Sequence, residues 1–164
     1  MNSFFITLTL FVNTVIGVKL THLHIPDLVY RGESVWFNCT YDLENEALYS
    51  IKWFKRNNEV KEEGVWSEFY RFIPNDDEVK KVYPMKGVKV DIEKSSLGNI
   101  YLVNVDPDTE GTYKCEVSAD APSFETVREE RDTRIYCEFI IKNDIYDEIF
   151  DPYILFIHLL GQIY

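Results

Sequence analysis

The stretch Gly111-Thr112-Tyr113-Lys114-Cys115-Glu116-Val117-Ser118 contains the second of two cysteines that decide the fold. In it, apolar and polar residues alternate, which is the period of a β-strand that buries one face. The same alternation recurs in three further runs, Ser34–Cys39, Ile51–Phe54 and Val88–Ile92. Short runs of this period, separated by turn residues, predict an all-β sandwich or barrel.

Cys39, Trp53 and Cys115 follow one another in the order of an immunoglobulin domain, where a tryptophan packs on the disulfide between two sheets. Tyr113 lies two residues before the second cysteine, which is the place of the tyrosine corner, whose hydroxyl bonds to upstream backbone. These residues agree with the strand pattern. They predict an immunoglobulin-like β-sandwich with one inter-sheet disulfide, Cys39–Cys115, and with Trp53 and Tyr113 as core landmarks.

The segment between Trp53 and Asp91 is long enough for two additional edge strands, which are termed C′ and C″ in this fold. We place strand C′ at Glu68–Ile73, with Asn75-Asp76-Asp77 as the turn that closes it. Such extra strands are typical of the variable type. We therefore predict that residues 18–136 form one variable-type immunoglobulin-like domain.

Composition and charge narrow the range of partners. The 164 residues are 46% hydrophobic and 27% charged, so the chain has enough apolar side chains for a buried core. The formal net charge of -11 disfavours nucleic acids and anionic lipids as partners. A partner protein with a basic surface would be attracted, although the same acidity can simply keep a secreted domain soluble.

Residues 1–17 have the pattern of a secretory signal peptide. Phe4–Val12 is an apolar run too short to span a bilayer, and Val15 and Gly17 suit cleavage before Val18. The basic residues that usually begin a signal peptide are missing. The alternative is that these residues form a buried N-terminal strand. We expect a secreted or extracellular protein, in which cysteines pair by default.

After Tyr136 the strand pattern gives way to a C-terminal tail, residues 137–164. Its last run, Tyr153–Tyr164, is too short for a transmembrane helix and matches a lipid-anchor signal only loosely. We expect an irregular or truncated end, so that any membrane association runs through a partner or through such an anchor. Cys137, the third cysteine, is left free or joined to another chain.

The sequence contains neither a phosphate-binding glycine loop nor a nucleophile or zinc-protease motif. His22 and His24 lie two residues apart on a predicted edge strand and point to one face, but two ligands are too few for a closed metal site. We therefore expect no enzyme activity, no cofactor, no metal and no small-molecule substrate.

Asn38-Cys39-Thr40 is an acceptor sequence for N-glycosylation. Because Cys39 points into the sandwich, Asn38 points outward, and the geometry permits a glycan there. The alternative is an unoccupied acceptor, because a place within a strand beside a structural cysteine can reduce occupancy.

In variable-type domains the sheet built from strands G, F, C and C′ usually serves as the docking face. Its predicted outward residues are Lys52 and Phe54 on C, Tyr70 and Arg71 on C′, and Glu116 on F. Aromatic and arginine side chains are the residue types of protein-interface hot spots. We predict that these five residues bind a partner. The alternative is that loops of the chain itself cover the two aromatic rings.

Several longer segments resemble one known family. They are Tyr41–Glu44, Leu48–Lys55, Glu68–Phe72, Gly87–Asp91 and Cys115–Phe124. Together they resemble the first immunoglobulin domain of the arthropod beaten-path family, over most of the chain between Leu20 and Thr126. The resemblance implies a secreted or membrane-tethered neuronal recognition protein, which acts in axon guidance and binds sidestep-family immunoglobulin receptors on other cells.

The sequence thus predicts an extracellular recognition and adhesion module whose partner is a protein receptor on another cell. Affinity would come from a few buried aromatic side chains, and partner choice from charges. The alternative is a soluble decoy or immune-type immunoglobulin protein without a signalling role. The fate of the tail distinguishes the two, because a processed anchor favours adhesion.

Overall fold

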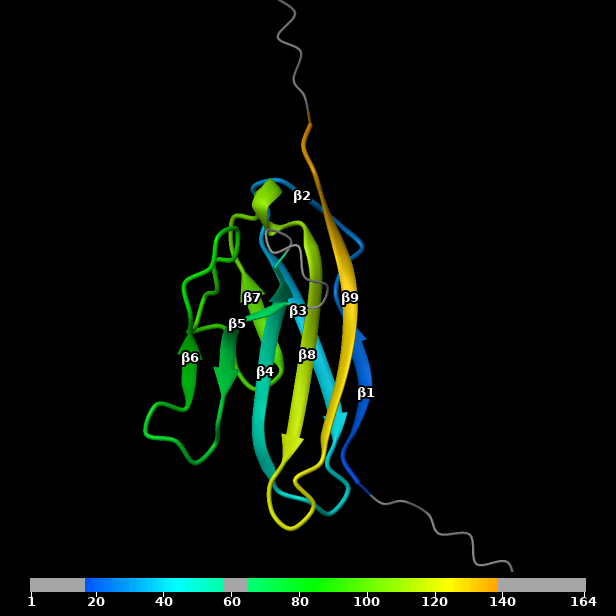
Figure 1. Cartoon of the computed structure of the whole chain (residues 1–164). Coiled ribbons are helices and arrows are strands. Elements are labelled where there is room, and N and C mark those ends of the chain that lie inside the picture. Colours follow the sequence, from blue (N-terminus) through cyan, green and yellow to red (C-terminus); the bar gives the residue numbers. More distant parts are fainter. Residues whose placement is uncertain (1–16, 58–64, 139–164) are drawn as a thin grey trace, which may run out of the picture.

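The computed structural model describes residues 17–57 and 65–138 (Figure 1). Most of the predicted signal peptide and most of the C-terminal tail lie outside these residues. The strands are β1 (Lys19–His24), β2 (Leu28–Tyr30), β3 (Val35–Asp42), β4 (Leu48–Arg56), β5 (Trp66–Phe72), β6 (Lys80–Val82), β7 (Asn99–Leu102), β8 (Gly111–Ala119) and β9 (Thr126–Tyr136). A 3-10 helix, Pro107–Thr109, connects β7 to β8.

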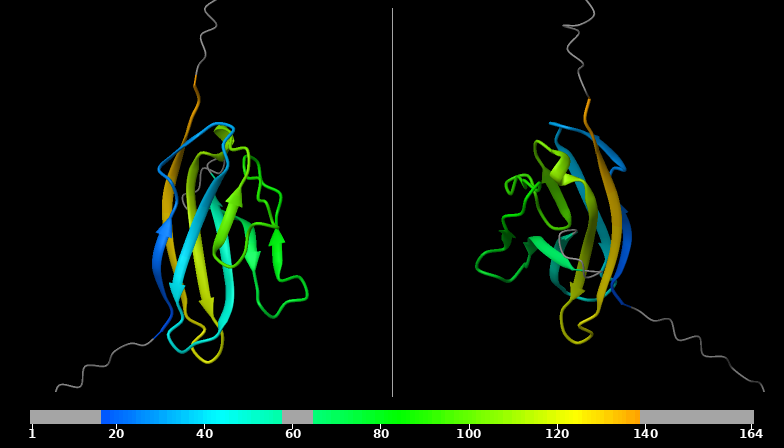
Figure 2. Two further views of the ribbon diagram at one scale, coloured as in Figure 1. Left: turned by 180° about the vertical axis from the view of Figure 1, so that it is seen from behind. Right: turned by 45° about the horizontal axis from the view of Figure 1, so that its top comes forward.

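The strands form two sheets that pack face to face, as the two views of Figure 2 show. One sheet has the order β1-β3-β7, and the other has the order β2-β9-β8-β4-β5-β6. Strands β9, β8, β4 and β5 correspond to G, F, C and C′, and β6 corresponds to C″. The predicted variable type is confirmed, because both additional edge strands are present and β5 pairs antiparallel with β4 and β6.

A disulfide between Cys39 on β3 and Cys115 on β8 joins the two sheets, as predicted. It closes a loop with a sequence separation of 76 residues, for which chain entropy implies a stabilisation of about 4 kcal/mol. The Trp53 indole is fully buried, and its Nε1 donates a hydrogen bond to Gly98 O at 3.1 Å. The Phe37 ring packs 5.9 Å from it, so the centre of the sandwich is aromatic.

The tyrosine corner fixes the entry to β8. Tyr113 is fully buried, and its hydroxyl donates a hydrogen bond to Thr109 O. The Thr109 hydroxyl in turn donates to Gly87 O at 2.6 Å. Gly87 has a φ of +74°, and a Cβ there would lie 2.2 Å from the backbone of Asp108, so only glycine fits this contact.

The run Val88–Ile92, predicted as a strand from its alternation, forms only isolated bridges, from Val88 to Met85 and from Val90 to Leu102. Val88 is buried, whereas Val90 and Ile92 are half-buried. The alternation in this run therefore corresponds to a partly buried segment at the edge of the smaller sheet, and not to a regular strand. Within residues 17–57 and 65–138, no helix is both long and apolar enough to cross a bilayer.

Candidate docking face

The outer surface of β9-β8-β4-β5 is the candidate site, and we term it the GFCC′ face. Strand register places its residues side by side, because directly opposed residues in antiparallel strands point to the same side. The opposed pairs are Lys52 with Arg71 and Glu116, Phe54 with Glu68 and Lys114, Arg56 with Trp66, Lys114 with Glu130, and Glu116 with Arg128. These pairs bring together ten residues from four strands.

At the centre of this face, the ammonium group of Lys114 lies between two aromatic rings. Its Nζ is 4.5 Å from the centre of the Phe54 ring and 4.6 Å from the centre of the Trp66 ring. Lys114 is only 7% exposed, although it belongs to the outer surface of the sheet. The rings thus cover the lysine, and each contact is of the cation–π kind, worth roughly 0.5 to 2 kcal/mol.

A second cation extends this cluster toward the neighbouring strand. The Arg56 guanidinium lies 5.1 Å from the centre of the Trp66 ring and forms an ion pair of 2.9 Å with Glu130 on β9. Glu116 lies 4.0 Å from the Lys114 ammonium. Trp66 on β5 therefore contacts a cation from the adjacent strand β4 and another from β8, the next strand along, and these contacts restrict the freedom of its ring.

Arg71 and Glu68 form the other half of the face. The Arg71 guanidinium donates two hydrogen bonds to the Glu68 carboxylate, at 2.7 Å and 2.9 Å, and lies 5.8 Å from the centre of the Tyr83 ring. The hydrogen bonds to Glu68 hold the pKa of Arg71 above its ordinary value. Lys52 stands between Arg71 and Glu116 in the strand register.

The structure corrects the outward placement of Tyr70. Its side chain is 0% exposed and belongs to the core. The register of β4 and β5 shifts between Trp53 and Phe54, because Trp53 opposes Tyr70 whereas Phe54 opposes Glu68. Phe69 is the extra residue of this β-bulge and is buried as well, so two consecutive side chains point inward and strict alternation fails.

The other four predicted docking residues, Lys52, Phe54, Arg71 and Glu116, are half-buried and lie on the GFCC′ face. Sequence reasoning missed Trp66, because the predicted strand C′ began two residues after it. Lys114 was missed although its alternation with Cys115 placed it outward. That alternation was the signal that could have added Lys114 to the face, but it could not have shown the contact with Trp66.

The remaining predicted residues lie elsewhere. Asn38 lies on β3 in the smaller sheet, and its Nδ2 donates to Asn99 Oδ1 at 2.9 Å. The rings of His22 and His24 stack on β1 with their centres 6.2 Å apart. Cys137 is a half-buried free thiol just after β9.

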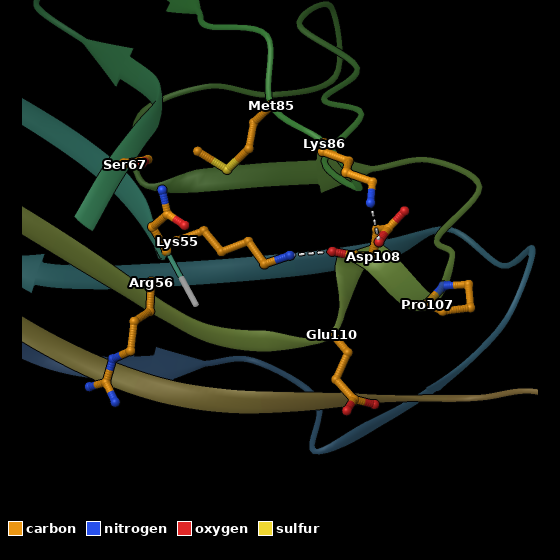
Figure 3. Close-up of a pocket in the computed structure, with 9 residues that line it drawn as sticks. Lys55, Arg56, Ser67, Met85, Lys86, Pro107, Asp108 and Glu110 are labelled. Carbon is orange, nitrogen blue, oxygen red and sulfur yellow. Dashed lines mark hydrogen bonds and ion pairs between the residues drawn. The ribbon is translucent and has the colours of Figure 1, made fainter. Parts of the chain in front are cut away.

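A pocket of about 370 Å³ opens at the end of the sandwich where β4 ends (Figure 3). The ammonium group of Lys55 donates to Asp108 O, and the Lys86 ammonium lies 3.0 Å from the Asp108 carboxylate. Burial lowers the pKa of Lys55, and the neighbouring Asp108 opposes this effect. Both cations are turned toward Asp108, so Lys55 connects the 3-10 helix to the end of β4, and Lys86 connects it to the segment between β6 and β7.

The chain matches the family model for the immunoglobulin V-set domain over residues 26–137. A search of curated protein sequences found no match. Among solved structures, domain 1 of VCBP3 from Branchiostoma floridae is 17% identical with a TM-score of 0.52, over 72% of this chain and 93% of that chain. This similarity supports the fold.

Two murine proteins are also similar in structure. CRIg is 18% identical with a TM-score of 0.48, over 71% of this chain and 97% of that chain. CEACAM1b is 17% identical with a TM-score of 0.49, over 73% of this chain and 54% of that chain.

The family match covers every described strand except β1, and it includes the Cys39–Cys115 disulfide and the strands of the GFCC′ face. V-set domains are typical of extracellular and cell-surface proteins, where they generally bind other proteins and do not catalyse reactions. The chain belongs to the immunoglobulin V-set domain family.

Proposed function

We propose that this chain is an extracellular recognition module that binds a partner protein through its GFCC′ face. We further propose that the partner is a sidestep-type immunoglobulin receptor and that the binding serves axon guidance. The V-set family supports the first proposal. The second is supported by the resemblance of segments such as Leu48–Lys55 and Cys115–Phe124 to the beaten-path family.

The observation that carries the docking proposal is the position of Lys114 between Phe54 and Trp66. Tryptophan and arginine are enriched among the interface residues that contribute most to affinity. Here Trp66 is held by Lys114 and by Arg56, so little side-chain freedom is left to lose on binding. A preorganised aromatic side chain of this kind favours affinity.

The charges on the GFCC′ face indicate which surface charge a partner would have. Its cations are Lys52, Arg56, Arg71, Lys114 and Arg128, and its carboxylates are Glu68, Glu116, Glu130 and, next along β9 on the same side, Asp132. The face is therefore slightly basic, although the whole chain has a formal net charge of -11. A partner with a weakly acidic or mixed surface fits this face better than the strongly basic partner that the net charge alone would favour.

The test uses the full-length chain, secreted from eukaryotic cells, against a panel of sidestep-type receptor ectodomains. Trp66→Ala is compared with Trp36→Ala, which removes a tryptophan from the outer surface of the opposite sheet. We expect saturable binding to one receptor, weakened about tenfold or more by Trp66→Ala and unchanged by Trp36→Ala. Equal loss in both variants would overturn the docking proposal. Absence of binding to every receptor would overturn the assignment of the partner.

A further inference from the structure

The outer surface of the smaller sheet differs in kind from the GFCC′ face. At its centre, Trp36 on β3 opposes Tyr101 on β7, and Asn38 opposes Asn99. On the other side, Asn38 opposes His24 of β1. Asn38 thus lies on the middle strand, in a part of the outer surface made of uncharged aromatic and polar side chains, whereas the charged pair Lys19 and Asp42 lies at the far end of the same strands.

Trp36 and Tyr101 form an aromatic pair on this surface. Their ring centres are 4.8 Å apart with an interplanar angle of 48°, and Trp36 is 41% exposed. The ammonium group of Lys94 lies 4.5 Å from the centre of the Tyr101 ring, at the edge of the patch. A tryptophan and a tyrosine in contact at the surface of a sheet leave apolar area that usually has a covering partner.

The residue next to this pair is the acceptor of the N-glycosylation sequence Asn38-Cys39-Thr40, which is the one such sequence in the chain. Residues two positions apart on a strand point to the same side and lie roughly 7 Å apart, so a group attached to Asn38 reaches Trp36. Asn38 Nδ2 uses one hydrogen in its bond to Asn99 Oδ1, and an amide nitrogen carries two. The second hydrogen can be replaced while the first bond is kept.

We propose that Asn38 carries an N-linked glycan whose first sugars lie on the Trp36–Tyr101 pair, so that sugar covers the outer surface of the β1-β3-β7 sheet. Asn38 Nδ2 forms a bond to C1 of the first sugar of a lipid-linked oligosaccharide. The bond from C1 to the lipid diphosphate breaks, the lipid diphosphate leaves, and the nitrogen loses one proton. The sugar's C–H groups then face the electron-rich faces of the rings.

The compartment that this reaction needs agrees with the disulfide, because Cys39–Cys115 bonds form where the environment is oxidising. The inference is independent of the docking proposal, which concerns the opposite sheet. It also gives the two outer surfaces different roles, since a surface covered by sugar cannot dock a protein closely. Figure 2 (left) shows the β3 and β7 strands of this surface from behind.

The first test is mass mapping of the chain secreted from eukaryotic cells, beside two variants at Thr40. Thr40→Ser keeps the acceptor sequence, whereas Thr40→Ala destroys it without touching Asn38. We expect a glycan on Asn38 in the wild-type chain and in Thr40→Ser, and none in Thr40→Ala. A folded, secreted wild-type chain with unmodified Asn38 would overturn the proposal.

The second test asks where the sugar lies. Hydroxyl-radical oxidation of Trp36 is measured in the glycosylated chain and in Thr40→Ala, with Trp66 on the opposite sheet as the internal control. We expect Trp36 to be oxidised several-fold more slowly in the glycosylated chain, and Trp66 to be oxidised equally in both. Equal oxidation of Trp36 in both forms refutes the packing of the glycan on this pair. So does loss of receptor binding in Trp36→Ala, which would make this surface a protein interface.

Discussion

The Trp66 ring covers the Lys114 ammonium, with 4.6 Å between the ring centre and Nζ. Together with Phe54, it leaves Lys114 with 7% of its surface exposed on the outer side of a sheet, where a lysine is ordinarily solvated. The aliphatic stem of the lysine is thereby packed like an apolar side chain. Substitutions at Lys114 can therefore separate the contribution of its charge to stability from that of its stem.

Lys114→Met keeps the length of the stem and removes the charge, whereas Lys114→Ala removes both. We expect Lys114→Met to lower the free energy of unfolding by less than about 1 kcal/mol, because losing the two cation–π contacts and the ion pair with Glu116 is partly offset by no longer burying a charge. We expect Lys114→Ala to lower it by about 1 to 2 kcal/mol, because the rings also lose packing. Urea unfolding measures both. Equal losses in the two variants would show that the charge, not the stem, stabilises the cluster.

Tyr113 and Tyr70 are buried tyrosines with opposite hydrogen bonding. The Tyr113 hydroxyl donates to Thr109 O, whereas the Tyr70 hydroxyl has no partner among the described residues. We expect Tyr113→Phe to cost about 1 to 3 kcal/mol of unfolding free energy and Tyr70→Phe to be neutral or stabilising, because it removes an unpaired buried hydroxyl. Thermal and urea unfolding of the pair decide this. A loss in Tyr70→Phe as large as that in Tyr113→Phe would contradict the assignment.

The same tyrosines predict a loss of stability in alkali. Burial raises the pKa of Tyr70 to about 12 and also raises the pKa of Tyr113. In the unfolded chain both hydroxyls ionise near pH 10, so above about that pH the unfolded state alone gains from deprotonation. Their contribution to stability is complete below about pH 10 and falls as the pH rises toward the folded pKa values.

We expect the free energy of unfolding to fall between about pH 10 and 11.5, and to fall less steeply in Tyr70→Phe, since one of the two shifted groups is then absent. Urea midpoints at several pH values measure the slope. Identical slopes in the wild-type chain and in Tyr70→Phe would show that Tyr70 ionises alike in both states. Tyr49→Phe, at an exposed tyrosine, serves as the control and is expected to keep the wild-type slope.

Replacing Cys39 and Cys115 together by alanine opens the loop that the disulfide closes. We expect the free energy of unfolding to fall by about 4 kcal/mol, a large part of the roughly 5 to 15 kcal/mol that holds a domain folded. The wild-type chain unfolded in the presence of a reductant should lose a similar amount. Cys137→Ala should leave stability almost unchanged, because this thiol lies just after β9 and is free.

The sequence was sufficient to predict the fold, because the features that specify this fold are patterns within single segments or the order of a few residues along the chain. Alternation, as around Cys115, specifies which residues of a strand enter the core. The order of Cys39, Trp53 and Cys115 specifies the sandwich, and these three residues are buried between its two sheets. The docking face was only partly predictable. Lys52, Phe54, Arg71 and Glu116 follow from alternation on strands of regular register.

Two residues depended on geometry that alternation does not contain. The bulge at Phe69 reverses the side on which Tyr70 points, and nothing in the order of residues in that strand marks the extra one. Trp66 joins the face only because β5 begins earlier than its apolar pattern suggests and pairs with Arg56. The cluster around Lys114 is a contact between three strands, which no single segment of sequence displays.

The parallel pairing of β2 with β9 has a mechanical consequence. Leu28 opposes Arg134, and Tyr30 opposes Tyr136, so β2 and β9 run in the same direction along this ladder. When tension pulls the two ends of the domain apart, parallel strands slide past one another, and their hydrogen bonds are loaded together in shear instead of opening one by one. Beyond that point, the segment between Cys39 and Cys115 stays closed by the covalent bond. We therefore expect this domain to resist pulling along the strands, and the disulfide to limit how far the chain extends when the domain yields.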